Sequence, residues 1–462
     1  MAGANLLEVI LPLLRNLVLA RLIAPEQLGL VFSLTIVSSI IEVSCDFGLP
    51  VYAVRTPGRD LSEDTLKTLH SLALIRSTIV GLVIMAISPA MAYMFGVPEF
   101  TWAYAALGLI SFLRGFENLG VKEAMRNYVF WREAAVLSGG QLAAVAATLA
   151  GAAISPTFTC MLWGMLSGAV ATVALTHLLS PRRYRLGWDA HAASDAIAFG
   201  RPLILHGTAI TVSMSDRLLV GTILGPAPLA LYSIAYGVAL LPRGVLGKFL
   251  TTILVPLFVG VRESKKPAEF LLNCWALGLS GLSFIYGIVL CLVGDQAIEF
   301  IFGSKYQPSR TFMCIAGLNV FVKLMLVLPV PRAYERGDTR LISFGSVLSA
   351  LSIIPGGLLL LFWKSLELFL LAITLAELIC SYAYIVRAMR EEAVDKLRIW
   401  LVISFPAAVL GGLVVFSFAR PEMGFGDWML IGTAALVISG LFYGAMSYRL
   451  VRNVQAPTQH MP

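Results

Sequence analysis

Charged residues are scarce in this chain. They make up 13% of its 462 residues, against 58% apolar residues, whereas a soluble protein carries about 25% charged residues. A large soluble helical protein would need polar helix faces, and the apolar stretches here lack them. The net charge of +7 does not indicate nucleic-acid binding, because the basic residues are spread thinly between apolar stretches, where they set membrane topology. The composition therefore predicts a membrane protein.

Metal-site and disulfide patterns are also missing. The six cysteines lie in or beside apolar stretches without any CxxC spacing, and the five histidines are isolated. Such cysteines behave as small buried hydrophobic residues, so the sequence predicts no disulfide, no metal site and no cofactor. No basic residue precedes Arg15 and no A-x-A cleavage pattern follows it, so we expect the first apolar stretch to be a membrane span rather than a signal peptide.

The sequence also lacks long segments outside the membrane. The longest gap on one side runs over about residues 294–310, and no soluble domain is inserted between apolar stretches. Enzymes that polymerise or transfer sugars at membranes usually need a sizeable extramembrane loop or domain. The chain is therefore predicted to be a transporter or channel and not an enzyme.

What the chain does contain is fourteen apolar stretches of membrane-spanning length. A hydrocarbon core of about 30 Å needs roughly 20 helical residues, and lipid cannot satisfy an unpaired backbone, so each stretch is predicted to be a helix. Prolines inside these stretches, Pro242 and Pro256 among them, are predicted kink points. The predicted spans are 4–23, 28–54, 70–95, 99–120, 134–154, 157–180, 198–224, 228–260, 268–293, 311–331, 341–363, 366–387, 399–419 and 427–448.

The basic residues alternate between the gaps. When residues within three positions of a span end are counted with the adjoining gap, 22 of the 34 lysines and arginines fall in every second gap and in the C-terminal tail, five fall in the intervening gaps, and seven lie inside the stretches. Basic loops stay in the cytoplasm. This pattern predicts a multi-pass protein with an even number of spans and with both termini cytoplasmic.

The chain also contains an internal repeat. Residues 16–31 align without gaps on residues 217–232, and in both copies the segment joins an outgoing helix to a returning one. Because the copies are six spans apart, they would have the same orientation, which indicates halves related by a pseudo-two-fold axis along the membrane normal. The identical positions are Leu17, Pro25, Leu28 and Leu30, repeated as Leu218, Pro226, Leu229 and Leu231.

Three runs carry a family resemblance. LVLARLIAPEQLGLV and EVSCDFGLPVYAVR in the first half, and SDRLLVGTILGPAPLALYSIAYGVALLP in the second, resemble bacterial polysaccharide transporters, the O-antigen flippase-like proteins. These belong to the multidrug, oligosaccharidyl-lipid and polysaccharide exporter superfamily. The resemblance implies an all-α polytopic membrane protein with about 14 transmembrane helices. Two six-helix lobes, 1–196 and 197–390, would surround a central cavity, and 391–462 would add two further helices and a short cytoplasmic tail.

The resemblance also implies a function. Proteins of this kind move undecaprenyl-pyrophosphate-linked oligosaccharides from the cytoplasmic to the periplasmic leaflet of the bacterial inner membrane, by alternating access. The expected partners are that lipid-linked substrate, membrane lipids, the polysaccharide polymerase and glycosyltransferases. No nucleic acid is expected to bind, and a monomer should be sufficient for transport. Two alternatives stay open: an ion-coupled multidrug antiporter of the same superfamily, and a membrane glycosyltransferase, ligase or polymerase.

Charged side chains inside the spans need a reason, because one at the bilayer centre costs about 3 kcal/mol on insertion scales. Arginine can bind a pyrophosphate bidentately, so basic residues are candidate cavity ligands for the carrier lipid. The alternative is pairing between helices, with long side chains reaching toward the span ends; Arg114 lies three residues before Glu117 and can pair with it directly. The five candidates are Arg15, Arg114, Arg217, Arg243 and Lys323.

Acidic residues inside the spans are candidates for ion coupling. Glu42, Asp46 and Glu377 could carry protons or bind sodium. Glu42 and Asp46 are four residues apart, which would stack both carboxylates on one helix face. The alternative for Asp46 is a capping or packing role, because Gly48 and Pro50 indicate the end of regular helix.

Overall fold

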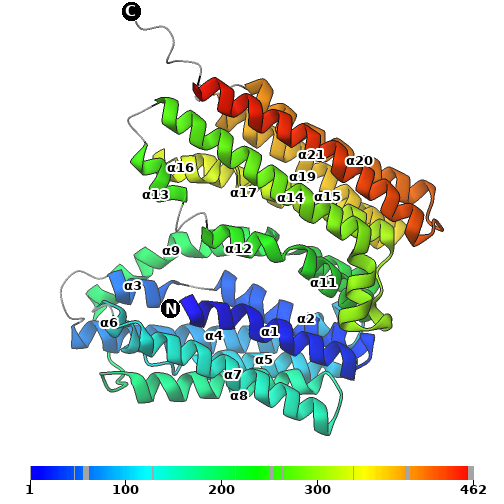
Figure 1. Ribbon diagram of the computed structural model, residues 1–462. Coiled ribbons are helices and arrows are strands. Elements are labelled where there is room, and N and C mark those ends of the chain that lie inside the picture. Colours follow the sequence, from blue (N-terminus) through cyan, green and yellow to red (C-terminus); the bar gives the residue numbers. More distant parts are fainter. Residues whose placement is uncertain are drawn as a thin grey trace, which may run out of the picture. The chain divides into compact units, whose positions relative to one another are not determined.

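The computed structural model describes residues 2–45, 47–55, 62–126, 129–213, 215–249, 254–261, 265–336, 338–390 and 396–455. Within these ranges every regular element is a helix (Figure 1). Large apolar side chains face outward: Leu430, Val437 and Leu441, on one face of a single helix, are 69%, 63% and 72% exposed. Such a surface suits lipid rather than water. The prediction of an all-α polytopic membrane protein is confirmed.

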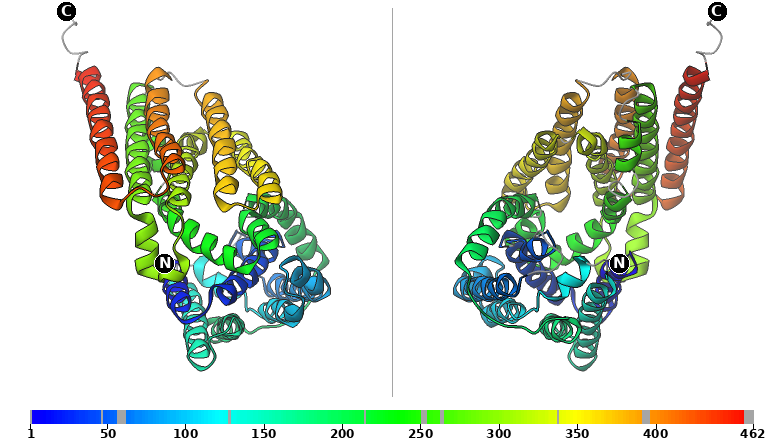
Figure 2. Two further views of the ribbon diagram at one scale, coloured as in Figure 1. Left: turned by 90° about the vertical axis from the view of Figure 1, so that its right-hand side faces the viewer. Right: turned by 90° about the vertical axis from the view of Figure 1, so that its left-hand side faces the viewer.

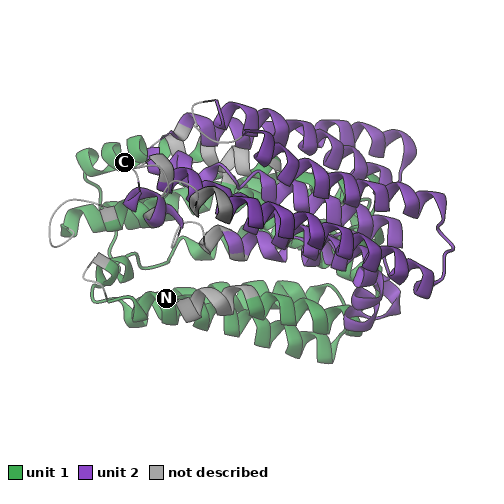
Figure 3. Ribbon diagram, turned by 45° about the horizontal axis from the view of Figure 1, so that its top comes forward, with its two compact units in different colours: residues 1–231 green, residues 232–462 purple. Residues whose placement is uncertain are grey.

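The chain divides into two compact units, Met1–Leu231 and Tyr232–Pro462 (Figure 3). The boundary falls inside a helix, α11 (Pro226–Ala239). The lobe boundaries expected from the sequence, at 196/197 and 390/391, stay predictions.

Unit 1 is built from helix pairs. The long α4 packs along α5, α7 packs along α8, and α1 packs on α7. Before α11 its elements are α1 (Ala2–Leu22), α2 (Pro25–Ser44), α3 (Leu49–Arg55), α4 (Glu63–Met94), η1 (Pro98–Phe100), α5 (Thr101–Arg114), α6 (Val121–Arg126), α7 (Trp131–Ile154), α8 (Thr159–Leu179), α9 (Ala190–Ser213) and α10 (Ser215–Leu224).

Unit 2 is organised around α15, which is buried at every residue from Phe312 to Met325. It packs against α14, α19 and α20, and α21 lies alongside α14 (Figure 2). After α11 the elements are α12 (Leu241–Phe249), α13 (Val255–Gly260), α14 (Lys265–Phe302), η3 (Ser304–Tyr306), α15 (Arg310–Met325), α16 (Val330–Arg336), α17 (Thr339–Leu351), α18 (Ile353–Trp363), α19 (Leu366–Ala388), α20 (Lys396–Ala419) and α21 (Phe425–Gln455).

Ten helical stretches in the described part of the chain are long and apolar enough to cross a membrane, so the count of fourteen stays a prediction. Several predicted spans are not one continuous helix: 28–54 is divided between α2 and α3, and 341–363 between α17 and α18. The span 99–120 holds only the 14-residue α5. The span 228–260 is not one helix, because Pro242 and Pro256 stand in the first turns of α12 and α13, where a residue without N–H is tolerated.

Each unit contains a close helix crossing at a pair of glycines. A Cβ on Gly108 of α5 would lie 2.5 Å from the carbonyl oxygen of Gly81 of α4, and a Cβ on Gly317 of α15 would lie 2.5 Å from that of Gly287 of α14. Only glycine allows backbones to approach so closely. The two crossings are separated in sequence by about as much as the repeated segments, which extends the repeat beyond the sixteen aligned residues.

The two copies of the repeated segment also meet within unit 1. A Cβ on Gly29 of α2 would lie 1.9 Å from the carbonyl oxygen of Pro226, the first residue of α11. The residue that aligns with Gly29 in the second copy, Ala230, is fully buried. Both copies therefore need a small residue at this position.

The segment between α8 and α9 is held on the first turns of α4. The ring of His70 accepts a hydrogen bond from the Leu119 backbone N–H at Nε2 (3.1 Å), which leaves Nδ1 to donate to the Arg185 carbonyl oxygen (3.1 Å). Ser71 donates to the carbonyl oxygen of Gly187 (2.8 Å). The buried histidine therefore joins two loops, which is a structural role.

Candidate functional site: charged and polar side chains within the helices

The main candidate site is a charged pair buried in unit 2. Lys323 of α15 pairs through its Nζ with Oε1 of Glu377 of α19. Both side chains are buried, Glu377 almost completely. A buried charge is costly unless it is paired and hydrogen-bonded. The pairing therefore explains how each of these two charged residues can be accommodated inside an apolar helix.

Three uncharged residues complete a polar network around this pair. Asn319, one turn before Lys323 on the same helix face, donates through Nδ2 to Oε2 of Glu377 (2.9 Å) and to the Thr374 hydroxyl (3.0 Å). Its own Oδ1 accepts from the hydroxyl of Tyr236 of α11 (2.6 Å). We call Tyr236, Asn319, Lys323, Thr374 and Glu377 the α15–α19 polar network.

Both carboxylate oxygens of Glu377 accept a hydrogen bond within this network. Glu377 uses one oxygen for the lysine and the other for the asparagine, so in this conformation Lys323 is held by protein rather than exposed to a ligand. A diphosphate would reach this cation only if the pair opened. The sequence singled out the two charges and missed Asn319 and Thr374, although their spacing of four and three residues from the charged positions was a usable signal.

Unit 1 contains a second pair of the same kind. Arg114, the last residue of α5, lies 3.0 Å from Oε1 of Glu42 of α2, and the Ser38 hydroxyl donates to the same oxygen (3.2 Å). Both charged side chains are more than two fifths exposed, so this pair is far less buried than the one in unit 2. As in unit 2, a candidate cation is joined to a candidate coupling carboxylate.

The structure pairs Arg114 with Glu42, and the local pairing of Arg114 with Glu117 stays a prediction. Helix α5 ends at Arg114, and the chain continues in a turn in which the Glu117 N–H donates to the Arg114 carbonyl oxygen (3.1 Å). The stacked pair of Glu42 and Asp46 also stays a prediction, because Asp46 lies outside the described residues.

The remaining three candidate cations are in three different settings. Arg15 is buried in α1, where its guanidinium donates to Oδ1 of its neighbour Asn16 (3.3 and 3.2 Å). Arg217 is half-buried on α10, and Arg243 is exposed in the first turn of α12. Among the carboxylates whose side chains the structure describes, none forms an ion pair with Arg15. The five candidates therefore differ in burial and in the partners that the structure gives them.

An apolar groove runs between α14 and α21 in unit 2. It has a volume of about 730 Å³, and glycines of both helices, Gly278, Gly281 and Gly440, contribute to its lining. The hydroxyl groups of Ser280 and Tyr443 meet at 2.7 Å across the two helices. Small residues on both helices leave room for a flexible apolar chain.

A family model described as Polysaccharide biosynthesis protein matches residues 18–311, more than half of the chain. The chain belongs to the polysaccharide biosynthesis protein family. The resemblance drawn from the repeated segments is thereby confirmed, and the match includes all of the three sequence runs on which it depended except Leu17.

Characterised and uncharacterised relatives of this polysaccharide biosynthesis protein are similar over part of their length. The lipopolysaccharide biosynthesis protein WzxC of Escherichia coli (strain K12) is 23% identical over 329 residues, which cover 69% of this chain and 65% of WzxC. The Lsg locus putative protein 1 of Haemophilus influenzae (strain ATCC 51907 / DSM 11121 / KW20 / Rd) is 23% identical over 171 residues, or 37% of this chain and 42% of the relative. The chain therefore spans less than two thirds of either relative.

Solved structures similar to this polysaccharide biosynthesis protein share its fold over nearly the whole chain. The lipid II flippase MurJ, in an inward closed conformation, matches with a TM-score of 0.69 at 13% identity and covers 96% of this chain and 99% of its own. A multidrug resistance MATE family transporter of the MOP superfamily, in an inward-facing conformation, matches with a TM-score of 0.62 at 14% identity, covering 86% and 96%. The chain thus has the MurJ and MATE fold.

Proposed function

We propose that this protein is a flippase that moves an undecaprenyl-pyrophosphate-linked oligosaccharide from the cytoplasmic to the periplasmic leaflet of a bacterial inner membrane. The product would serve lipopolysaccharide or exopolysaccharide synthesis. The protein transports by alternating access and catalyses no change in its substrate.

The observation that carries this proposal is a cation buried inside the helices of a chain of this family. Lys323 stands in α15, where lipid or protein surrounds it, and charge at that depth marks a substrate or ion path by default. Two similar proteins support the same function, since WzxC is a lipopolysaccharide biosynthesis protein and MurJ is a lipid II flippase.

In this proposal the two charge pairs act as exchangeable partners. When the pyrophosphate enters, it takes the place of Glu377 beside Lys323 and of Glu42 beside Arg114, so neither cation is left unpaired during transport. Arg15, Arg217 and Arg243 supply further contacts along the path. Guanidinium groups suit this role because their N–H donors match phosphate oxygens bidentately.

The carboxylates released in this exchange provide a route to ion coupling. Protonation of Glu377 or Glu42 removes the negative charge that competes with the pyrophosphate, and Asp46 is the third candidate of this kind. Binding of the pyrophosphate to the cation is then coupled to protonation of the carboxylate. Transport is then driven by protons if the state with bound substrate and a protonated carboxylate is favoured on only one of the two faces of the membrane.

The lobes of the transporter are proposed as residues 1–196 and 197–390, rocking about a central cavity that holds the glycan. The polyprenyl tail remains in lipid, with the groove between α14 and α21 as its track. Both termini and the basic gaps face the cytoplasm, following the distribution of lysine and arginine. A monomer suffices, and the polysaccharide polymerase and glycosyltransferases are the expected partners.

The second candidate function is an ion-coupled multidrug antiporter, favoured by the structural likeness to the MATE family transporter. An antiporter would move amphipathic cations, for which a buried lysine is an unfavourable neighbour. The two functions therefore differ in the charge of the cargo.

The test is translocation of radiolabelled undecaprenyl-pyrophosphate oligosaccharide in proteoliposomes. Wild type should transport it, and the double variant K323M/E377Q, which removes both buried charges without leaving either unpaired, should lose most of that activity. Arg243→Ala should lose activity as well. The matched control is Lys305→Met, an exposed lysine of η3, which should transport like wild type. Drug efflux without any lipid transport would reject the flippase and support the antiporter.

A further inference from the structure

Unit 2 contains an open cavity at the end of α16, at the start of α17 and at the end of α19, away from the α15–α19 polar network. Its volume is about 500 Å³, within the usual range of about 300–1,000 Å³ for ligand pockets. The residues that line it come from α14, α16, α17 and α19, from the turn between α16 and α17, and from the residues just before α16 and just after α19. It is therefore part of the fold of one unit and needs no contact with the other.

The charge of this cavity is strongly one-sided. Of its fourteen lining residues, four are arginine, namely Arg332, Arg336, Arg387 and Arg390, and one, Asp338, is acidic. Asp338 is already engaged as the N-cap of α17, where Oδ1 accepts from the Leu341 backbone N–H (2.9 Å). Glu335 pairs with Arg332, and an anion in the cavity would gain charge-assisted hydrogen bonds from the arginines.

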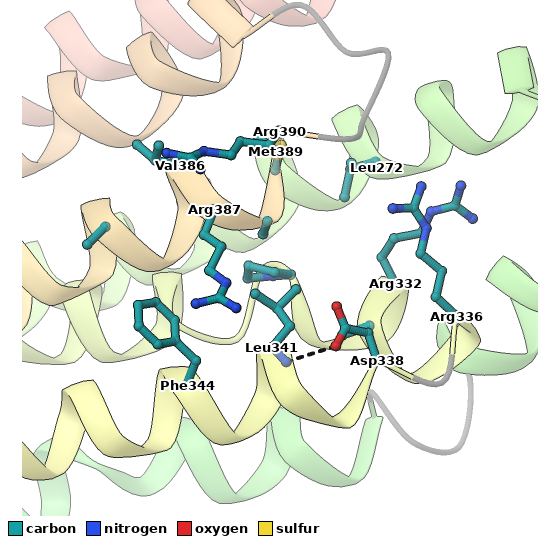
Figure 4. Close-up of a pocket in the computed structure, with 14 residues that line it drawn as sticks. Leu272, Arg332, Arg336, Asp338, Leu341, Phe344, Val386, Arg387, Met389 and Arg390 are labelled. Atoms are coloured by element: carbon teal, nitrogen blue, oxygen red, sulfur yellow. Dashed lines mark hydrogen bonds between the residues drawn. The ribbon is translucent and has the colours of Figure 1, made fainter.

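The arginines are held in place by the fold (Figure 4). Arg332 and Arg336 are one turn apart on α16 and extend in the same direction, and Arg332 is fixed by Glu335 at 2.7 Å. Arg387 of α19 reaches across to α17, with its guanidinium 4.5 Å from the centroid of the Phe344 ring. Stacking on a ring occupies the face of a guanidinium and leaves its N–H edge for an anion.

The rest of the lining is apolar. Leu272, Leu341, Phe344 and Met389 border the same space as the arginines. A soluble inorganic anion gains nothing from such a border, whereas the first methylene groups of a lipid chain do. The arginines also lie at or beside two of the basic gaps, those after the predicted spans 311–331 and 366–387, that the sequence predicts at the cytoplasmic membrane surface, where anionic lipid headgroups concentrate.

We propose that this cavity binds the phosphate or diphosphate headgroup of a membrane lipid, with Arg332, Arg336, Arg387 and Arg390 as its ligands. Two sources share this chemistry: the carrier lipid awaiting transport, and an anionic phospholipid of the bilayer. The proposal uses none of the five candidate transport cations and does not depend on which lipid is moved.

The test measures binding to purified full-length protein in an uncharged detergent. The probes are farnesyl diphosphate, dioctanoyl phosphatidylglycerol, uncharged dioctanoylglycerol and inorganic pyrophosphate. Wild type should bind farnesyl diphosphate, phosphatidylglycerol or both, and R336Q/R387Q should lower that affinity about tenfold or more, because each variant arginine removes charge-assisted hydrogen bonds. The matched control is R420Q, an exposed arginine after α20 that does not line the cavity, and it should bind like wild type.

The choice of probes distinguishes the carrier lipid from an anionic phospholipid. Preference for farnesyl diphosphate would assign the carrier lipid, and equal binding would make this a general lipid-phosphate site. Equally tight binding of inorganic pyrophosphate would overturn the lipid assignment, and equal losses in R420Q would overturn the cavity. If R336Q/R387Q does not fold, R336Q/R390Q tests the same charge loss with the contact between Arg387 and Phe344 kept. Headgroup binding that survives a failed transport assay would defeat the proposed function and leave this inference standing.

Discussion

At the scale of single residues, the pair formed by Lys323 and Glu377 is the most consequential contact in unit 2. Replacing Lys323 with Met leaves a buried carboxylate, and replacing Glu377 with Gln leaves a buried ammonium group. Each single variant should lose about 3–5 kcal/mol of stability, because an unpaired buried charge is left behind. The double variant K323M/E377Q should lose much less than the sum.

Thermal unfolding of the four proteins in detergent, arranged as a double-mutant cycle, checks this expectation. The neutral glutamine still offers an amide oxygen to Asn319, so the rest of the α15–α19 polar network is kept. Additive losses in the cycle would mean that the two charges do not stabilise each other.

A second residue-scale prediction concerns the glycine crossing of α4 and α5. Gly108→Ala places a methyl group 2.5 Å from the Gly81 carbonyl oxygen, so the helices must separate, at a cost of about 1–3 kcal/mol. The matched control is Gly412→Ala on α20, where a Cβ has no neighbour within 4 Å. That control should keep or slightly raise the melting temperature, since alanine favours a helix. Equal losses in both variants would show that helix propensity, not contact, decides the outcome.

At the scale of elements, the hairpin of α20 and α21 is fastened to α14 and α15 at its turn. The indole N–H of Trp428, which is fully buried, donates to the Cys291 carbonyl oxygen (2.9 Å). Arg310, the first residue of α15, donates to the Met423 carbonyl oxygen (2.8 Å) and lies 5.5 Å from the Trp428 ring centroid. The last two helices are therefore tied to the rest of unit 2 by specific polar contacts as well as by apolar packing.

Trp428→Phe should loosen this fastening by about 1–3 kcal/mol, because it removes the N–H donor and leaves a buried carbonyl without it. Limited proteolysis in the turn between α20 and α21 is the measurement, with faster cleavage expected. Trp363→Phe, at a position that is 62% exposed, should cleave at the wild-type rate. Unchanged cleavage in Trp428→Phe would assign the attachment to packing alone.

At the scale of the whole molecule, the distribution of basic residues predicts which ends of the helices face the cytoplasm. Single cysteines at Arg336 and Arg398 should react with an impermeant thiol reagent only in inverted vesicles, and cysteines at Lys305 and Arg420 only in intact spheroplasts. The six native cysteines would first be replaced. Labelling of Lys305 and Arg336 from the same side would contradict the topology.

Which features of the structure could be predicted from the sequence depends on the kind of signal. Hydropathy is summed over twenty residues, so it predicted the helical membrane class well, and the repeated segments led to the family. The pairing of Arg114 with Glu42 was not predicted, because α5 ends at Arg114 and its partner comes from another helix. The partners of Lys323 are set by which faces of α15 and α19 meet. Sequence spacing on one helix carries no information about that.

The α15–α19 polar network also has a consequence for how the chain is made. Lys323 emerges from the ribosome 54 residues before Glu377, and Asn319 precedes its partners Thr374 and Glu377 by similar lengths. During that interval α15 carries an ammonium group and an amide without their acceptors, which makes it a poor candidate for release into lipid. Its integration is therefore expected to wait at the translocon until α19 has been synthesised. Ribosomes stalled between the two helices should leave α15 in contact with the translocation channel.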